Sequence, residues 1–197
     1  MENKKSSRDI IMDRILMSQP DPVAHPDVPI YGIAGDPVKN FIERLESFDG
    51  KALSFRSRRE ALDWLEQNID RKAKRVYSSL LDFEGNVSDN DVADPHAAHI
   101  VDICVAQGAM GVGEMGSIYV TDESLGHAAC ALFSTDLYLL LDRSKIVDGM
   151  HRAYELLELR ANRYGSFFTG PSATADIEAI HITGAQGEIS LTAILYN

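Results

Sequence analysis

Apolar residues near the N-terminus recur at helical spacing and then give way to a run of breakers. The helical pattern follows Ser6 and Ser7, either of which suits an N-cap, and ends near Met17. Four prolines then keep residues 19–29 extended. We therefore expect residues 1–30 to form a helix and a proline-rich arm that packs on the body or on a partner.

Helical and strand patterns alternate over the next part of the chain. Asp36-Pro37 begins a helix whose apolar stripe runs to Leu45, and residues 51–55 form a short strand. A capping-box sequence at 57–60 begins the next helix, and a strand follows at 75–79. This alternation predicts an α/β domain over residues 31–197, with a mostly parallel sheet covered by helices on both faces.

The second half of the chain breaks this regular alternation. A polar, acidic segment at 84–98 predicts a loop before the strand 100–106. The strand 117–121 follows after a glycine-rich gap too short for a crossover helix, so these strands are not expected to form a standard parallel βαβ pair. The remaining pattern predicts helices near 126–133 and 148–162 and strands at 137–141, 166–169, 181–183 and 190–196.

Length and charge narrow the class of protein. A chain of 197 residues with 45% hydrophobic and 25% charged residues is typical of one globular core. The net charge of -11 would repel nucleic acid and anionic membranes, so an anionic substrate needs a local positive site. Residues 1–8 lack the apolar core of a secretion signal, and no stretch is apolar enough to span a membrane, so we expect a cytoplasmic protein.

The chain contains two cysteines, Cys104 and Cys130, both inside apolar runs. This usage fits a reducing compartment and structural rather than reactive thiols. An iron–sulfur cluster usually takes about four thiolates, so this chain cannot hold one alone. We expect the purified protein to be colourless, without stoichiometric iron, zinc or flavin, and any redox centre to lie in a partner.

A glycine-rich turn is the first candidate for chemistry. Gly111-Val112-Gly113-Glu114-Met115-Gly116 has the letters of the dinucleotide fingerprint, but it leads into the β-favouring segment from Ser117 instead of a helix. Nucleotide binding is therefore not expected. Glu114, flanked by Gly113 and Gly116, could serve as a nucleophile, a base or a hydrogen-bond acceptor for a substrate, or simply accept N–H bonds that pin its turn.

A second candidate follows the strand 166–169. The segment Gly170-Pro171-Ser172-Ala173-Thr174-Ala175-Asp176-Ile177-Glu178 places hydroxyls beyond a strand end, where a following helical turn would offer an anion site. Ser172 and Thr174 suit that role, and a plain capped turn is the alternative.

Other polar groups have plainer explanations. His96 and His99 could share a helical face, but no third metal ligand lies nearby in the sequence, so no metal site is expected. The basic run from Arg56 to Arg75 is most simply a solvated helix face. The sequence contains none of the common phosphate-loop, nucleophile-elbow, C-x-x-C or H-E-x-x-H signatures.

Taken together, these segments resemble the lactate utilisation protein C family, which carries the LUD domain. Residues 170–178 match that family's Gly-Pro-Ser-x-Thr-Ala-Asp-Ile-Glu signature at every fixed position, and the turn 108–117 is similar to its glycine-rich segment. The resemblance extends from the helix at 7–10 to the final strand at 194–195. Two features depart from the family pattern: Ala173 replaces a residue that is often basic, and Gly184-Ala185-Gln186-Gly187-Glu188 replaces Gly-Val-His-Gly-Pro.

The resemblance implies a three-layer α/β/α sandwich similar to the CoA-transferase and ribose-phosphate isomerase fold. It also implies a place in a lactate-to-pyruvate oxidation system whose partner subunits hold iron–sulfur clusters. This chain would then be an accessory or substrate-handling subunit, not active alone, with no cofactor of its own and a small carboxylate as its ligand.

The sequence leaves a second function open. A stand-alone enzyme of the same fold group, an acyl-CoA transferase or a sugar-phosphate isomerase, would use Glu114 as nucleophile or base. In either case we expect the Glu114 turn and the turn 170–178 to meet in one cleft. The ligand-binding residues of that cleft would be Gly113, Gly116, Ser117, Gly170, Pro171, Ser172, Thr174, Asp176 and Glu178.

Overall fold

The computed structural model describes residues 5–21, 23–24, 26, 29, 32–157, 164–175, 181–185 and 187–197. The chain divides into two compact units, residues 1–30 and 31–197. In the first unit, α1 spans Ser7–Met17, and the Ser6 side chain accepts a hydrogen bond from the Asp9 amide. The predicted helix and its serine cap are thus confirmed, and none of the residues of α1 is buried.

A five-stranded parallel sheet forms the centre of the second unit. Its strands lie in the order β1, β11, β6, β3, β2, and every neighbouring pair is parallel. Their bounds are Lys51–Ser54 (β1), Ser190–Tyr196 (β11), Asp136–Asp142 (β6), Ile103–Gln107 (β3) and Val76–Ser78 (β2). Parallel strands put all their carboxyl ends at one edge, which is where open α/β sheets bind ligands.

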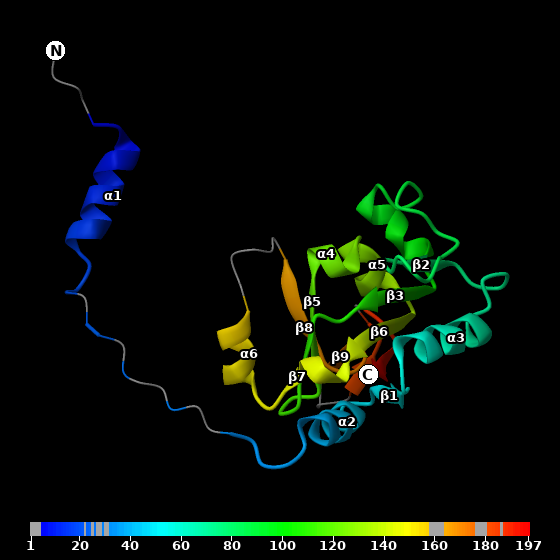
Figure 1. Ribbon diagram of the computed structural model, residues 1–197. Coiled ribbons are helices and arrows are strands. Elements are labelled where there is room, and N and C mark those ends of the chain that lie inside the picture. The colour runs from blue at the N-terminus through cyan, green and yellow to red at the C-terminus, as the bar shows by residue number, and fades with distance from the viewer. Residues whose placement is uncertain are drawn as a thin grey trace. The chain divides into compact units, whose positions relative to one another are not determined.

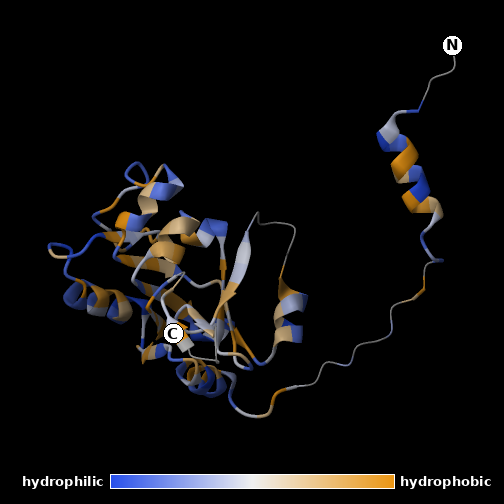
Figure 2. Cartoon of the chain, turned by 180° about the vertical axis from the view of Figure 1, so that it is seen from behind, coloured by the Kyte–Doolittle hydropathy of each residue, from blue (hydrophilic) through white to orange (hydrophobic). Residues whose placement is uncertain are grey.

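One face of this sheet is covered by α3, which spans Arg58–Asn68. The Ser57 side chain caps the helix by accepting from the Glu60 amide, as the sequence predicts. Buried Ala61 and Leu65 pack against strand residues that include Leu140. Figure 2 shows mostly hydrophobic central strands, whereas α3 carries both hydrophobic and hydrophilic residues, as a helix does that covers a core with one face.

The opposite face is covered by helices and by a second, smaller sheet. The helical elements are α2 (Pro37–Ser47), the 3-10 helix η1 (Pro95–Ile100), α4 (Asp122–Leu125) and α5 (Ala128–Phe133). The small sheet has the order β7, β4, β5, β8, with bounds Ile146–Val147, Met110–Val112, Ser117–Thr121 and Gly165–Phe168. The body is therefore a three-layer α/β/α sandwich, as predicted (Figure 1).

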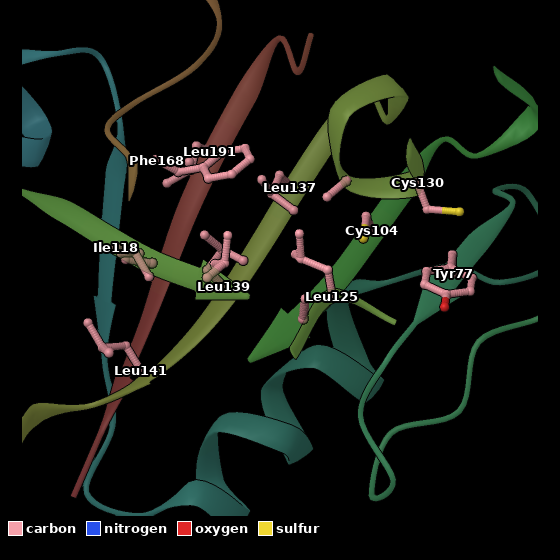
Figure 3. Close-up of a cluster of buried hydrophobic side chains, with 14 of the residues drawn as sticks. Tyr77, Cys104, Ile118, Leu125, Cys130, Leu137, Leu139, Leu141, Phe168 and Leu191 are labelled. Carbon is pink, nitrogen blue, oxygen red and sulfur yellow. The ribbon is translucent and has the colours of Figure 1, made fainter. Parts of the chain in front are cut away.

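The core on this second face joins the two sheets. Ile118 of β5 and Phe168 of β8 lie in the same buried cluster as Leu139 of β6 and Leu191 of β11 (Figure 3). The glycine-rich gap after β3 leads into β4, which pairs antiparallel with β5 in the small sheet. The prediction that the strands at 100–106 and 117–121 are not a parallel βαβ pair is confirmed.

Several predicted elements differ from the structure in extent. Residues 95–100 of the predicted loop and strand form η1, so β3 begins at Ile103. The helix predicted near 126–133 is α5, Ala128–Phe133, and a short helix that was not predicted, α4, precedes it at Asp122–Leu125 and ends at Gly126, where φ is 66°. The helix predicted over 148–162 is α6, which spans Met150–Leu156 and ends at Leu157, an extended residue, while residues 158–162 lie outside the described residues.

The segment after Gly170 also differs from its prediction. Over its described residues, 171–175, no helical turn follows: Ala173–Ala175 form β9, which pairs antiparallel with β10 (His181–Thr183). The helical anion site predicted for Ser172 and Thr174 is therefore wrong in its geometry. Asp176 and Glu178 lie outside the described residues.

Candidate functional site

Glu114 sits on the turn between β4 and β5 and is half-buried. Its amide donates to the Asp148 carbonyl at 2.8 Å, and its Oε2 accepts from the Met150 amide at 2.9 Å. Met150 is the first residue of α6, whose Gly149 N-cap has no side chain to cap the helix. Glu114 therefore supplies the missing cap from a distant turn, and its negative charge suits a helix N-terminus.

The two glycines beside Glu114 allow a close approach of backbones. A Cβ at Gly113 would lie 2.8 Å from the Pro37 carbonyl, and one at Gly116, where φ is 65°, would overlap the backbone of Leu45. The turn is therefore pressed against α2. An open cavity of about 440 Å³ lies beside this turn, and its lining includes Gly113, Glu114, Ile33 and the α2 residues Asn40 and Arg44.

The turn after β8 is held in a similar way. Gly170 has φ 65°, and a Cβ there would overlap the Phe48 carbonyl at the end of α2. Ser172 donates its amide to the Glu188 carbonyl at 2.9 Å, and its carbonyl accepts from the Gly184 amide at 2.7 Å. A shallow pocket of about 260 Å³ is lined here by residues 166–172, Leu132 and Glu188.

The two predicted turns are neighbours, but they do not share a cavity in the described part of the chain. Strands β5 and β8 pair antiparallel, so Ser117 and Thr169 adjoin and their hydroxyls share a hydrogen bond. Glu114 nevertheless lines the cavity beside α2, whereas Gly170, Pro171 and Ser172 line the other pocket. The site residues thus gather at one end of the small sheet and face two separate openings.

Glu188 lines the second pocket and is only 5% exposed. Burial raises the pKa of its carboxyl, because the charged form loses hydration, and a hydrogen bond from its own amide offsets only part of this effect. In the sequence, Glu188 differs from other residues only as part of the segment 184–188, which departs from the family's Gly-Val-His-Gly-Pro turn. A buried carboxyl that lines the same pocket as Ser172 is able to exchange a proton with a ligand.

Replacing Glu188 by glutamine should stabilise the fold at neutral pH. Folded Glu188 holds its proton more tightly than the unfolded chain does, so stability falls as pH rises from the ordinary pKa of 4.5 through the raised one. Glutamine carries no charge at any pH. Chemical denaturation should show E188Q more stable by roughly 1 kcal/mol at pH 8, with no difference near pH 4.

The exposed Glu46 provides the control for this measurement. E46Q should follow the wild type at both pH values. A Glu188 variant whose advantage is the same at pH 4 and pH 8 would show that the carboxyl titrates normally.

The two histidines considered for metal binding are arranged by η1. His99 Nδ1 lies 2.6 Å from the His96 carbonyl, so the His99 ring is engaged by its own local backbone. Among the residues that the structure describes, no group of three or more His, Cys, Asp or Glu side chains is placed to hold a metal ion. No described helix is long and apolar enough to cross a membrane.

Both cysteines lie in the core on the sheet face that α5 covers (Figure 3). Burial raises the pKa of the Cys130 thiol to about 11, and burial likewise raises the pKa of Cys104 well above its ordinary value. Both thiols are therefore neutral at physiological pH. Metal clusters need thiolates, so these cysteines do not fit an iron–sulfur cluster.

A cluster of hydrogen-bonded polar side chains that the sequence did not predict lies at the carboxyl edge of the parallel sheet. Arg58, the first residue of α3, contacts Asp82, Gln107 and Tyr196 through its guanidinium group. The solvated-face interpretation is therefore wrong for Arg58. Its partners are 24, 49 and 138 residues away in sequence, so no local motif marks them.

Comparison with known proteins identifies the domain to which both predicted turns belong. A family model described as the LUD domain matches residues 95–196. The chain is also similar to a crystal structure of a DUF162 family protein from Deinococcus radiodurans, with a TM-score of 0.64 and 14% identity. That alignment covers 82% of this chain and 96% of the other, and at such identity it shows a common fold. No curated protein matches the chain.

Proposed function

Because this chain belongs to the LUD domain family, we propose that it is an accessory, substrate-handling subunit of a system that oxidises lactate to pyruvate. Partner subunits carry the iron–sulfur clusters of that system, and this chain binds a small carboxylate. The resemblance of residues 170–178 to the signature of lactate utilisation protein C supports this choice within the family.

The placement of the two cysteines is the observation that carries the proposal. Oxidising lactate to pyruvate removes two electrons, which must leave through a cofactor. Cys104 and Cys130 are buried in the core as neutral thiols, so the chain offers no thiolates for a cluster. The electrons therefore pass to centres in other chains, and the role left for this subunit is to bind and orient the substrate.

Glu114 supports a second candidate, a stand-alone transferase or isomerase, because it lines a cavity beside glycines. Its Oε2 is already engaged by the Met150 amide, however, and this hydrogen bond holds the N-terminus of α6. The capping role explains Glu114 without chemistry. We therefore favour the accessory subunit.

Purification at native expression level tests the partnership. A tagged chain should elute with partner proteins that contain iron and acid-labile sulfide in a constant ratio to the chain across a gel-filtration peak. A parallel purification from untagged cells controls for proteins that bind the resin. Elution of the chain by itself, free of iron and sulfide at low ionic strength, would contradict the proposal.

A further inference from the structure

A separate cavity lies at the carboxyl ends of β2 and β3, lined by residues 58 and 79–82, which precede the LUD match, and by residues within the match. Its volume is about 500 Å³, which accommodates a small organic acid. Its polar lining consists of Arg58, Asp82 and Gln107 together with hydroxyl groups and one glutamate: Ser79, Thr121, Glu123 and Ser124. Arg58 is the single cation among these lining residues. In a protein with a net charge of -11, such a cation is the local positive site that an anionic ligand requires.

The guanidinium of Arg58 is held in the geometry of carboxylate recognition. Its Nε donates to one oxygen of Asp82 at 2.7 Å and its Nη2 to the other at 2.8 Å. The remaining terminal nitrogen donates to Gln107 at 2.6 Å and to the Tyr196 hydroxyl at 3.0 Å. Two sheet strands thus fix one end of the guanidinium, while its bidentate edge binds a carboxylate.

The Asp82 carboxylate lies on an exposed part of the segment after β2, from which it is able to move away from Arg58. Leu80 and Phe83 are buried and anchor the segment after β2, whereas Leu81 between them is fully exposed and the Asp82 side chain is 43% exposed. Solvent screens an ion pair that is this exposed, so the pair adds little to the stability of the fold. Asp82 is therefore able to turn to solvent at small cost, without moving either anchor.

We propose that Arg58 is the receptor for the carboxylate of a small 2-hydroxy or 2-keto acid, and that Asp82 occupies the place of this carboxylate when no ligand is bound. The assignment to this class of acid rests on the proposed function, whereas the carboxylate site rests on the geometry of Arg58. On binding, the ligand carboxylate takes the bidentate edge, Asp82 moves to solvent, and no covalent bond changes. Gln107 and Tyr196 keep the guanidinium in position throughout.

The test is calorimetric titration of the full chain with lactate and with pyruvate at fixed ionic strength. D82N removes the internal competitor and should tighten binding by up to about fivefold, the factor that corresponds to an exposed ion pair of about 1 kcal/mol. R58K keeps the charge but loses the bidentate edge, and should weaken binding by at least about tenfold. Methyl lactate, which has no charged carboxyl, should bind none of the three proteins.

A second ion pair provides the matched control. Arg71 and Glu66 form a bidentate pair with distances of 2.6 and 2.7 Å away from this cavity. E66Q breaks that pair and should bind both acids as the wild type does. Circular dichroism and thermal melting confirm that each variant is folded, and D82N tests the site even if R58K is unstable.

Three results would contradict the assignment of Arg58 as the carboxylate receptor. The first is that neither wild type nor D82N binds the acids, the second is that D82N and wild type bind them equally, and the third is that R58K binds them as tightly as wild type does. Failure of the site is distinguishable from failure of the proposed function. If iron–sulfur proteins co-purify while D82N binds no better than wild type, the site alone is wrong. If the titrations succeed and the chain elutes without partners, the carboxylate site stands and the accessory role falls.

Discussion

Gly170→Ala should destabilise the protein by about 3 kcal/mol or more, enough to lower the melting temperature by roughly 6–12 °C. Two costs add at this position. Gly170 has φ 65°, a left-handed conformation that costs an L-residue about 1–2 kcal/mol. The new methyl group would also overlap the Phe48 carbonyl, a backbone atom at the end of α2 that no rotamer change can move aside.

Gly116→Ala should have an effect of similar size, because Gly116 has φ 65° and its methyl would overlap the backbone of Leu45. Gly32→Ala is the matched control: a Cβ there meets nothing nearer than an Asp148 carboxyl oxygen at 3.9 Å. Differential scanning calorimetry compares the three variants. If G170A and G116A melt within about 2 °C of G32A, the close packing of both turns on α2 is not as described.

This packing gives the candidate site its rigidity. The turn with Glu114 joins β4 to β5, and the turn with Ser172 joins β8 to β9, yet the C-terminal end of α2 packs against both turns, at Gly116 and at Gly170. The hydrogen bond between the Ser117 and Thr169 hydroxyls also joins the start of β5, which follows the first turn, to the end of β8, which precedes the second. A mutation that loosens either glycine contact should therefore disturb both openings together.

Much of the fold follows from local signals in the sequence. Ser6, Asp36 and Ser57 each stand directly before an apolar helical period, and each caps the helix predicted from it. The apolar run of β6 marks a buried strand because its neighbours β11 and β3 cover both of its edges. Such signals are contained in a few consecutive residues, so they can be recognised without knowledge of the tertiary structure.

The elements that the sequence did not predict depend on distant partners. β7 has only two residues, and β4 and β9 have three each, too few for a period to be recognised. They are strands because other segments pair with them: β7 with β4, and β9 with β10. The unpredicted α4 has four residues, also too few for a helical period, and ends at Gly126, where φ is 66°.

The candidate site likewise has some features that the sequence reveals and others that depend on distant contacts. Gly113, Glu114 and Gly116 are conspicuous as a turn, but the role of Glu114 depends on Met150, which lies 36 residues away. Arg58 looks like any exposed arginine of a basic run until β3 and β11 bring Gln107 and Tyr196 beside it. Electrostatic function in this chain is thus a property of tertiary contacts more than of motifs.

Lactate-dependent dye reduction should be absent from the isolated chain and present once its iron–sulfur partners are added. Dye reduction is expected to rise from background to sustained turnover, because in the proposed system the two electrons leave lactate through cofactors of the partner chains. Its two thiols are neutral and buried, and its glycine-rich turn leads into β5 instead of a nucleotide-binding helix. In the proposed system the partners supply the redox centres, and this chain supplies the bound substrate.

Glu114→Gln serves as the control for chemistry in this reconstituted system. The amide oxygen of glutamine still accepts the Met150 hydrogen bond, so the cap of α6 and the turnover should both persist. Loss of turnover in E114Q with intact assembly would instead assign Glu114 a chemical role.

The most direct test of the accessory role is therefore the rate of dye reduction by lactate, measured for the purified chain, for the purified partners, and for both together. The accessory role predicts background rates for the chain by itself, and a rate for the mixture well above that of the partners without it. Sustained lactate oxidation by the purified chain alone would contradict it.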